Sequence, residues 1–446
     1  MFSATVSWPT APVTKSLVLD ALNAIEPPPP VLDTPDPDRP TLFWSTYDDI
    51  DHELVHSRRD VAASILASSY TFRKALIRKH FLSRCLSFYL AKNKDSPLRA
   101  AIELSFADEL DEMLLDELYE LGQALDKGRW WILKPQVALQ SACSSSTIYR
   151  GMADRGNGVR MFNSRDALTR IFEEFEEAES DEEEENEEDE SKASTAVVTS
   201  QLRHFVIQEY LPNPLLLDPL EAATSIDTKP EPLSGRKFHL RAYCVASGSL
   251  HIYLFHKILA LFSAVPYASP TATADDDGDP LPIDLGPHLT NTALQTDRGD
   301  ENVRLLDELV GCHILSGPDP AEHAREFTKT DMQHILDQIV VVLAETFRAA
   351  VQMPTHFQPT SNAFELFGID LLVSDTLQVT LLEVNAEPAI ELTGPRLHWI
   401  LRDLFGAMGK VCVQPFFAST SVPGTTWPVG ETREGLIKCL DLDLRM

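Results

Sequence analysis

Two strand-like segments near the C-terminus carry acidic and amide side chains where a buried strand normally avoids them. The segments cover 364–370 (FELFGID) and 381–385 (LLEVN), and residues 374–376 predict the turn between them. Because alternate residues of a strand share a face, Glu383 and Asn385 point the same way, and Asp370 can meet them across the hairpin. Their oxygens need a cation or hydrogen-bond donors, and this donor set suits Mg²⁺. On spacing alone, an edge hairpin with one solvated polar face is an equally good interpretation.

Basic side chains upstream indicate an anion site. Lys134 ends an apolar strand predicted over 129–135, and a buried ammonium group needs an anion such as a phosphate. Lys237, His239 and Arg241 alternate, so they share one face of a second strand; a sheet edge protected by lysine is the alternative. The glycine-containing loop 155–158 (RGNG) can bring backbone N–H groups close to a phosphate, although a plain turn explains it as well.

Other motifs point away from several enzyme classes. Residues 52–56 (HELVH) match the zinc-protease signature HExxH, but no third ligand follows at the usual spacing, so we expect a charged surface helix. The sequence contains no GxxxxGK[ST], GxGxxG or GxSxG motif. P-loop nucleotidases, Rossmann dehydrogenases and serine hydrolases of the nucleophile-elbow type therefore lack support.

Charge and composition narrow the class of protein further. The 446 residues carry a net charge of −30, and 14 acidic residues with no basic one fall within 173–190. Such a run repels itself and predicts a disordered, solvated insert. The remaining chain is still acidic, which argues against nucleic-acid or anionic-membrane binding. The six cysteines are scattered and form no CxxC pair, which predicts reduced thiols. The sequence shows no signal peptide and no apolar run of about 18 residues, so we expect a cytoplasmic protein.

The elements that must position these residues predict an α+β (α/β) fold. Strands are expected at 204–211, 237–245 and 250–255, and helices at about 300–312, 329–352 and 394–408. We expect five parts. The first two are a disordered Pro-rich N-terminus (1–40) and a mostly helical region (41–126) with a basic segment at 72–80 and acidic helices at 100–126. A central part (127–212) with a disordered acidic insert (173–200) is followed by a C-terminal part (213–425) with the hairpin and a flexible loop (268–287), and by a tail (426–446).

Placed in order, these motifs resemble the tubulin–tyrosine ligase family, whose catalytic unit has an ATP-grasp fold. The resemblance covers about residues 129–405. This part of the chain is also similar to the ligase-like domain of a fungal P-body-associated protein. The matching segments are 131–135 (WILKP), the loop with its two glycines, 207–211 (IQEYL) with 213–216 (NPLL), 236–241 (RKFHLR), 288–291 (HLTN), 364–370 and 382–388 (LEVNAEP).

The resemblance assigns a role to each matching position. It implies a catalytic set of Lys237, Arg241, Thr290 and Asn291. It implies nucleotide contacts from Lys74, Lys134, Arg155, Gly156, Gly158, Gln208, Glu209, Tyr210, Leu211, Lys237 and His239. It implies that Mg²⁺ is held by Asp370, Glu383 and Asn385.

The implied activity is ATP- and Mg²⁺-dependent joining of an amino acid to a protein through an acyl phosphate. The expected partners are a free amino acid and a protein substrate such as the C-terminal tail of tubulin, and the chain is expected to act as a monomer. Two positions depart from the family pattern, because His239 stands where Asp is usual and His256 and Lys257 stand where Arg is common. The alternative is an ATP-binding, ligase-like interaction module of cytoplasmic P-bodies with little or no ligase activity.

Overall fold

The structure is a computed structural model that describes most of the chain. The described residues are 2–36, 38–58, 64–103, 105–109, 123–125, 127–136, 159–174, 204–222, 232–272, 283–290, 302–317, 325–418 and 427–444. The predicted residues Arg155, Gly156, Gly158 and Asn291 lie outside these ranges, as do most of the acidic insert and the middle of the 268–287 loop.

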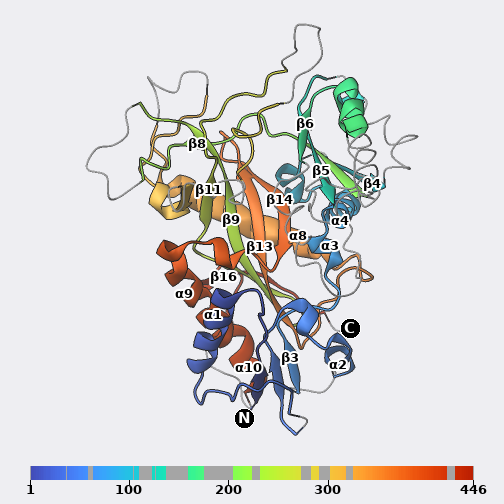
Figure 1. Ribbon diagram of the computed structural model, residues 1–446, viewed down its shortest axis with the longest axis vertical. Coiled ribbons are helices and arrows are strands. Elements are labelled where there is room, and N and C mark those ends of the chain that lie inside the picture. The colour runs from blue at the N-terminus through green and yellow to red at the C-terminus, as the bar shows by residue number, and fades with distance from the viewer. Residues whose placement is uncertain are drawn as a thin grey trace, which may run out of the picture.

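The N-terminal part is folded around a small parallel sheet at the bottom of Figure 1. Its strands are β1 (Ser3–Thr5), β2 (Thr41–Phe43) and β3 (Ile65–Ala67), and its first helices are α1 (Pro12–Asn23) and α2 (His52–Ser57). The expectation of a disordered 1–40 segment is wrong. Helix α1 buries one largely apolar stripe at i, i+3, i+4 spacing, and this burial offsets the conformational entropy lost when the segment is ordered. The buried residues are Thr14, Leu17, Val18, Ala21 and Leu22.

The region 41–126 is also less helical than predicted. Helices α3 (Lys74–Ile77) and α4 (Lys79–Lys92) and the short η2 (Pro97–Ala101) are present, but β2 and β3 lie in the same region. Strand β4 (Ser105–Glu109) occupies part of the segment expected to form acidic helices. It leaves this region and pairs with β7 (His204–Glu209), so tertiary pairing overrides local helix propensity there.

A second sheet has four described strands in the order β4-β7-β5-β6 and lies at the upper right of Figure 1. Strands β5 (Trp131–Gln136) and β6 (Arg160–Phe162) complete it. Every pairing is antiparallel, and the sheet has its own small core that includes Trp131, Leu133, Phe162 and Ile207. Lys134 is thus carried by a unit with an independent core.

The largest sheet has nine described strands around the long strand β9 (Arg236–Ser247). One edge of β9 pairs with β13 (Phe364–Val373), and β13 pairs with β14 (Val379–Ala386). The pair β13–β14 is the hairpin that the sequence predicted. The other strands are β8 (Leu216–Leu217), β10 (His251–Phe255), β11 (Leu259–Phe262), β12 (Val303–Leu305), β15 (Thr432–Arg433) and β16 (Leu436–Asp441). The expected 426–446 tail is therefore part of this sheet, because β16 pairs with β10 and buries Leu436, Cys439 and Leu440.

Helices cover the two faces of this sheet. The even-numbered residues of β9, from Phe238 to Ala246, pack in one core with α4 and α8 (Lys329–Ala350). On the opposite face, Tyr243 and Val245 pack in a second core with α1 and α9 (His398–Met408). The remaining elements are the short helices η1 (Tyr47–Asp49), η8 (Leu306–Leu309), η9 (Ile390–Leu392), η10 (Pro395–Leu397), η11 (Gly409–Val413) and α10 (Gln414–Phe417).

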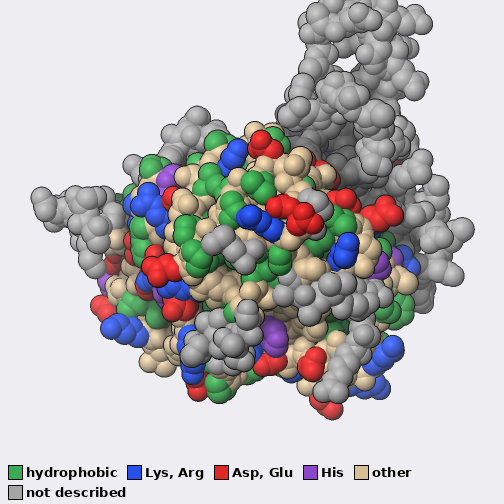
Figure 2. Space-filling model, turned by 90° about the horizontal axis from the view of Figure 1, so that it is seen from below, with side chains coloured by type: hydrophobic (Ala, Val, Ile, Leu, Met, Phe, Trp, Pro, Cys, Tyr) green, Lys and Arg blue, Asp and Glu red, His purple; other side chains and the backbone are tan. Residues whose placement is uncertain are grey.

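These elements confirm the predicted α+β class and the helix predicted at 329–352, which is α8. The helix predicted at about 300–312 is wrong, because β12 and η8 occupy that segment. Each cysteine within the described ranges is buried and forms no disulfide, as expected: Cys85, Cys244, Cys312, Cys412 and Cys439. No described helix has the length and apolar character needed to cross a membrane. On the face in Figure 2, acidic and basic side chains are interspersed, so the net negative charge does not form one acidic field there.

Candidate active site

The hairpin brings its three polar side chains together on one face of the large sheet. Asp370 pairs in register with Glu383, and the amide of Asn385 lies beside both. Its Nδ2 donates to Asp370 Oδ2 at 3.2 Å and to Glu383 Oε1 at 3.0 Å. The alternation and the turn place these groups together, while their role as metal ligands stays a prediction.

Two cations neutralise the carboxylates. Arg241, opposite Asp370 in the register of β9 and β13, donates to both of its oxygens, with Nη2 to Oδ2 at 2.8 Å. Lys79 Nζ lies 3.1 Å from Glu383 Oε2. Burial favours the neutral acid, but Lys79 and Lys134 outweigh it and hold the pKa of Glu383 well below its ordinary value. Burial likewise opposes the charge of Arg241, yet Asp370 raises its pKa.

Lys79 was not predicted as a site residue. Lys74, which was predicted, is exposed at the start of α3. The backbone between them is extended at Arg78 (φ −105°, ψ 117°), so the two lysines belong to different helices with different directions. The sequence signal was the basic segment 72–80, but its local pattern does not reveal this break. A phosphate contact for Lys74 stays a prediction.

Lys134 and Lys237 bring two further ammonium groups to the cluster. Lys134 Nζ donates to Gln208 Oε1 at 2.6 Å, in a small groove also lined by Lys79 and Leu381. Burial lowers the pKa of Lys134 to about 8, although Glu383 opposes the shift. Lys237 is buried with Nζ 4.2 Å from the ring centre of Tyr210. Burial, and then the charge of Lys134, lowers its pKa to about 7.

His239 presents a buried nitrogen that has no partner. Its Nδ1 lies 2.6 Å from Thr290 Oγ1, while Nε2 has no hydrogen-bond partner within the described part of the chain and is 3.8 Å from Asp370 Oδ1. Burial lowers the pKa of His239, so the ring is neutral at neutral pH. A buried ring nitrogen of this kind is costly unless a ligand completes its hydrogen bonding.

The segment 208–211, predicted to contact the nucleotide, has side chains that face several different partners. Gln208 faces Lys134, whereas Glu209 forms an ion pair with Arg129 at 2.7 Å. The Tyr210 hydroxyl lies 3.0 Å from His288 Nδ1, and Leu211 is half-buried. Gln208 and Tyr210 therefore adjoin the lysine cluster, while Glu209 is directed to Arg129.

The cluster has an excess of positive charge. Among the described residues, four basic side chains, Lys79, Lys134, Lys237 and Arg241, face the two carboxylates Asp370 and Glu383, and the excess remains positive with Lys237 only partly protonated near pH 7. Within the described ranges, no three His, Cys, Asp or Glu side chains gather as a metal-ligand group. Mg²⁺ is commonly bound by one or two carboxylates together with phosphate oxygens, so two carboxylates and the Asn385 amide fit Mg²⁺ that arrives with a polyphosphate.

Comparisons with known proteins identify the family of the chain. Residues 66–421 match the Tubulin-tyrosine ligase family. A probable tubulin–tyrosine ligase of Schizosaccharomyces pombe is 34% identical over 400 residues, which cover 85% of this chain and 84% of the relative. The probable tubulin–tyrosine ligase PBY1 of Saccharomyces cerevisiae is 34% identical over 84% of this chain, and the match spans 46% of that relative's length.

A solved structure is similar over nearly the whole chain. The C-terminal domain of Pby1 from K. lactis, described as an ATP-grasp enzyme that interacts with the mRNA decapping enzyme Dcp2, superposes with a TM-score of 0.63 and 28% identity and covers 99% of both chains. The chain therefore has an ATP-grasp fold, and it belongs to the tubulin–tyrosine ligase family.

Proposed function

We propose that this chain is an ATP- and Mg²⁺-dependent ligase that joins an amino acid to a protein by forming an amide bond. The observation that carries the proposal is the excess of positive charge beside the paired carboxylates of Asp370 and Glu383. This arrangement suits a polyphosphate with its metal, and the ATP-grasp fold agrees with it.

The residues of the cluster have distinct roles in this proposal. The ammonium groups of Lys134 and Lys237 bind phosphate oxygens, and the orphaned Nε2 of His239 completes its hydrogen bonding with the ligand. Asp370 and Glu383, with the amide oxygen of Asn385, would hold Mg²⁺, which supplies charge neutralisation at the phosphates. Arg241 is oriented by its two bonds to Asp370 and stabilises negative charge on the transferred group.

The proposed chemistry needs no nucleophile from the protein. A carboxylate oxygen of one substrate forms a bond to the γ-phosphorus of ATP as the bond to ADP breaks. The amine of the second substrate then attacks the acyl carbon and expels inorganic phosphate, leaving an amide after loss of a proton. Positioning and charge stabilisation carry both steps, which is consistent with the absence of nucleophile-elbow and P-loop motifs from the sequence.

The proposed substrates are a free amino acid and an acceptor protein, with the tubulin tail as the first acceptor to test because two relatives are named probable tubulin–tyrosine ligases. We propose that the chain acts as a monomer in the cytoplasm. An acidic acceptor tail meets a locally basic cluster although the whole chain carries −30, so local charge governs its approach.

An amino-acid transfer assay tests the proposal. Purified protein is incubated with ATP, Mg²⁺ and radiolabelled tyrosine, glutamate or glycine, with and without detyrosinated tubulin. We expect ATP-dependent label in protein from the wild type and from Glu53→Gln, an exposed glutamate on α2, and none from Glu383→Gln. Undiminished transfer by Glu383→Gln would overturn the proposed site.

A second candidate is an ATP-binding interaction module with little ligase activity, acting in P-bodies. It is favoured by the similarity to Pby1, described as interacting with Dcp2, and by His239 at a position where Asp is usual in the family. ATP binding without transfer of any of the three amino acids, to tubulin or to a decapping-complex protein, would select this candidate.

A further inference from the structure

A second polar cavity lies toward the opposite end of β13 from the lysine cluster. It has a volume of about 170 Å³ and is lined by the N-terminal part, by β13, by the loop after β14 and by α9. Leu366, which lines it, is four residues from Asp370, so the two places are about 13 Å apart along the strand. Pro388 separates them, because it packs against Gly368 beside Arg241.

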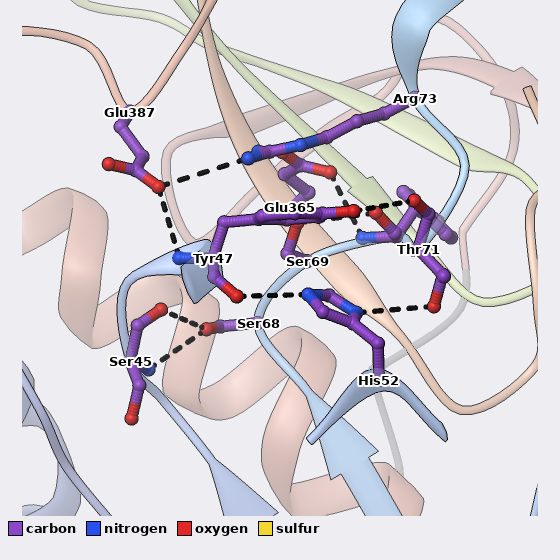
Figure 3. A network of polar contacts seen from close by, with 10 residues as sticks. Ser45, Tyr47, His52, Ser68, Ser69, Thr71, Arg73, Glu365 and Glu387 are labelled. Carbon is purple, nitrogen blue, oxygen red and sulfur yellow. Dashed lines mark hydrogen bonds and ion pairs between the residues drawn. The ribbon is translucent and has the colours of Figure 1, made fainter. Parts of the chain in front are cut away.

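One wall of the cavity is built on Arg73, as Figure 3 shows. Arg73 is buried, donates through Nη1 to Glu365 Oε1, and stacks 4.1 Å above the centre of the Tyr47 ring. The second oxygen of Glu365 accepts the backbone N–H of Tyr70 at 3.0 Å. The charge of Glu365 is therefore satisfied inside the wall.

His52, from the HExxH motif, supports this wall. Its Nε2 lies 2.9 Å from the carbonyl oxygen of Tyr47 and its Nδ1 lies 3.2 Å from Thr71 Oγ1. A carbonyl only accepts, so Nε2 carries the proton and Nδ1 accepts from Thr71. This holds Tyr47 so that its backbone N–H donates to Glu387 Oε1 at 3.1 Å.

Glu387 is the carboxylate that remains available to a ligand. Glu391, also in the lining, accepts the backbone N–H groups of Val13 and Thr14 at 3.2 and 2.9 Å, so the N-terminus of α1 satisfies it. Glu387 lies 3.9 Å from Arg73 Nη2, and its side chain is 39% exposed. Within the described ranges both of these contacts are made by Oε1, so Oε2 is the oxygen that a ligand in the cavity can reach.

Part of the cavity lining is apolar. Trp44, Phe405 and Met408 line it and are buried. A water molecule needs roughly 10–15 Å³ of such volume, so the cavity has room for on the order of ten non-hydrogen atoms. The matching ligand has a cationic donor at one end and an apolar body of amino-acid size at the other.

We propose that this cavity binds an ammonium group carried on an apolar body of amino-acid size, with Glu387 Oε2 as the acceptor and Trp44, Phe405 and Met408 as the apolar floor. Two sources supply this chemistry: a free amino acid, or the N-terminal residue of a polypeptide. With a free amino acid as the ligand, the proposal deepens the proposed ligase function and rests on it; binding to the cavity is measured without ligation, so the failure of one is distinguished from the failure of the other.

Isothermal titration calorimetry with phenylalaninamide, which has the ammonium group and no carboxylate, tests the proposal. Its matched probe is 3-phenylpropionamide, which lacks only the amine. We expect phenylalaninamide to bind and 3-phenylpropionamide not to bind. Glu387→Gln should weaken phenylalaninamide binding about tenfold or more, because a charged hydrogen bond becomes a neutral one. The matched variant Glu53→Gln, exposed on α2, should bind as the wild type does.

A second variant guards against a misfolded Glu387→Gln protein. Ala389 is exposed and lines the cavity, so Ala389→Phe should fill its mouth and abolish binding while the circular dichroism spectrum stays unchanged. Tighter binding of phenylalaninamide than of Phe-Gly-Gly amide assigns the site to a free amino acid, and the reverse assigns it to a polypeptide N-terminus. No binding of either probe, or equal binding by wild type, Glu387→Gln and Ala389→Phe, would overturn the proposal.

Discussion

The two ends of the β13–β14 hairpin differ in the sign of the charge around them. At the Asp370 end, four basic side chains outnumber two carboxylates. At the Leu366 end, Arg73 is outnumbered by Glu365, Glu387 and Glu391. Both places use the same strands, so the backbone does not set their chemistry. The difference comes from the elements that pack on each end.

Different elements supply the charges at each end. The cations reach the Asp370 end, called the upper end, from α4, from β5 of the four-stranded sheet and from β9. At the Leu366 end, called the lower end, the N-terminal part brings Arg73 and hydroxyl groups, and the loop after β14 brings the carboxylates of Glu387 and Glu391. An anionic ligand is therefore expected at the upper end and a cationic ligand at the lower end. The predictions below separate these two expectations.

The largest expected effect follows from Arg73→Met, which breaks the wall of the lower end. The substitution leaves Glu365, 2% exposed, as a buried unpaired carboxylate, and we expect a loss of about 3–5 kcal/mol in the free energy of unfolding by urea. The control is Arg348→Met, which removes a 44% exposed partner of Glu345 and should cost at most about 1 kcal/mol. Equal losses in the two variants would contradict the buried-pair account.

Lys237→Met should separate the two ends by affinity. The substitution keeps the shape of a buried side chain and removes one cation from the upper end, so affinity for a non-hydrolysable ATP analogue should fall about 100-fold. Phenylalaninamide binding should not change. Lys92→Met, at an exposed position at the end of α4, serves as the control and should bind the analogue normally. A similar loss in both variants would show that general charge, not this site, binds the nucleotide.

Gly368→Ala should disturb both ends at once. A Cβ at this position would lie 2.8 Å from Pro388 Cβ and 3.3 Å from Arg241 Cδ, so we expect a loss of about 1–3 kcal/mol in stability and weaker binding of both ligands. Gly406→Ala is the matched control, because its Cβ would meet nothing within 4 Å on α9 and should stabilise by up to about 1 kcal/mol. Unchanged stability in Gly368→Ala would refute this close packing.

The smallest expected effect is the pH dependence of nucleotide binding. Lys237, with its pKa lowered to about 7 by burial, loses its proton as the pH rises through 7 in the free protein, while the bound anion favours the charged form. Affinity for the ATP analogue should therefore fall by up to about tenfold between pH 7 and pH 8. The slope should be shallower in Lys237→Met. Affinity that rises with pH would contradict the assigned role.

The upper end was largely predictable because its signals are local. Alternation in two strands placed Glu383 with Asn385 and Lys237 with His239 and Arg241, and the short turn fixed Asp370 opposite Glu383. The anion-binding residue that was missed, Lys79, lies beyond a helix break at Arg78 that no residue type announces.

The lower end was not predictable by the same reasoning. Tyr47, Arg73, Glu365 and Glu387 come from four distant segments, and only tertiary packing brings them together. The adjoining helix α1 had a readable stripe of apolar residues, but the proline-rich run that follows at 26–40 favoured a prediction of disorder for the whole segment. Strand β16 was missed because its partner β10 lies about 185 residues earlier in the chain.

The central claim is that the upper end binds a nucleotide through Mg²⁺ held by the hairpin carboxylates. Calorimetric titration of a non-hydrolysable ATP analogue, with and without Mg²⁺, tests it in the wild type, Glu383→Gln and the control Glu53→Gln. We predict that Mg²⁺ strengthens binding about tenfold or more in the wild type and in Glu53→Gln, and has no effect in Glu383→Gln. An undiminished effect of Mg²⁺ in Glu383→Gln would contradict the claim.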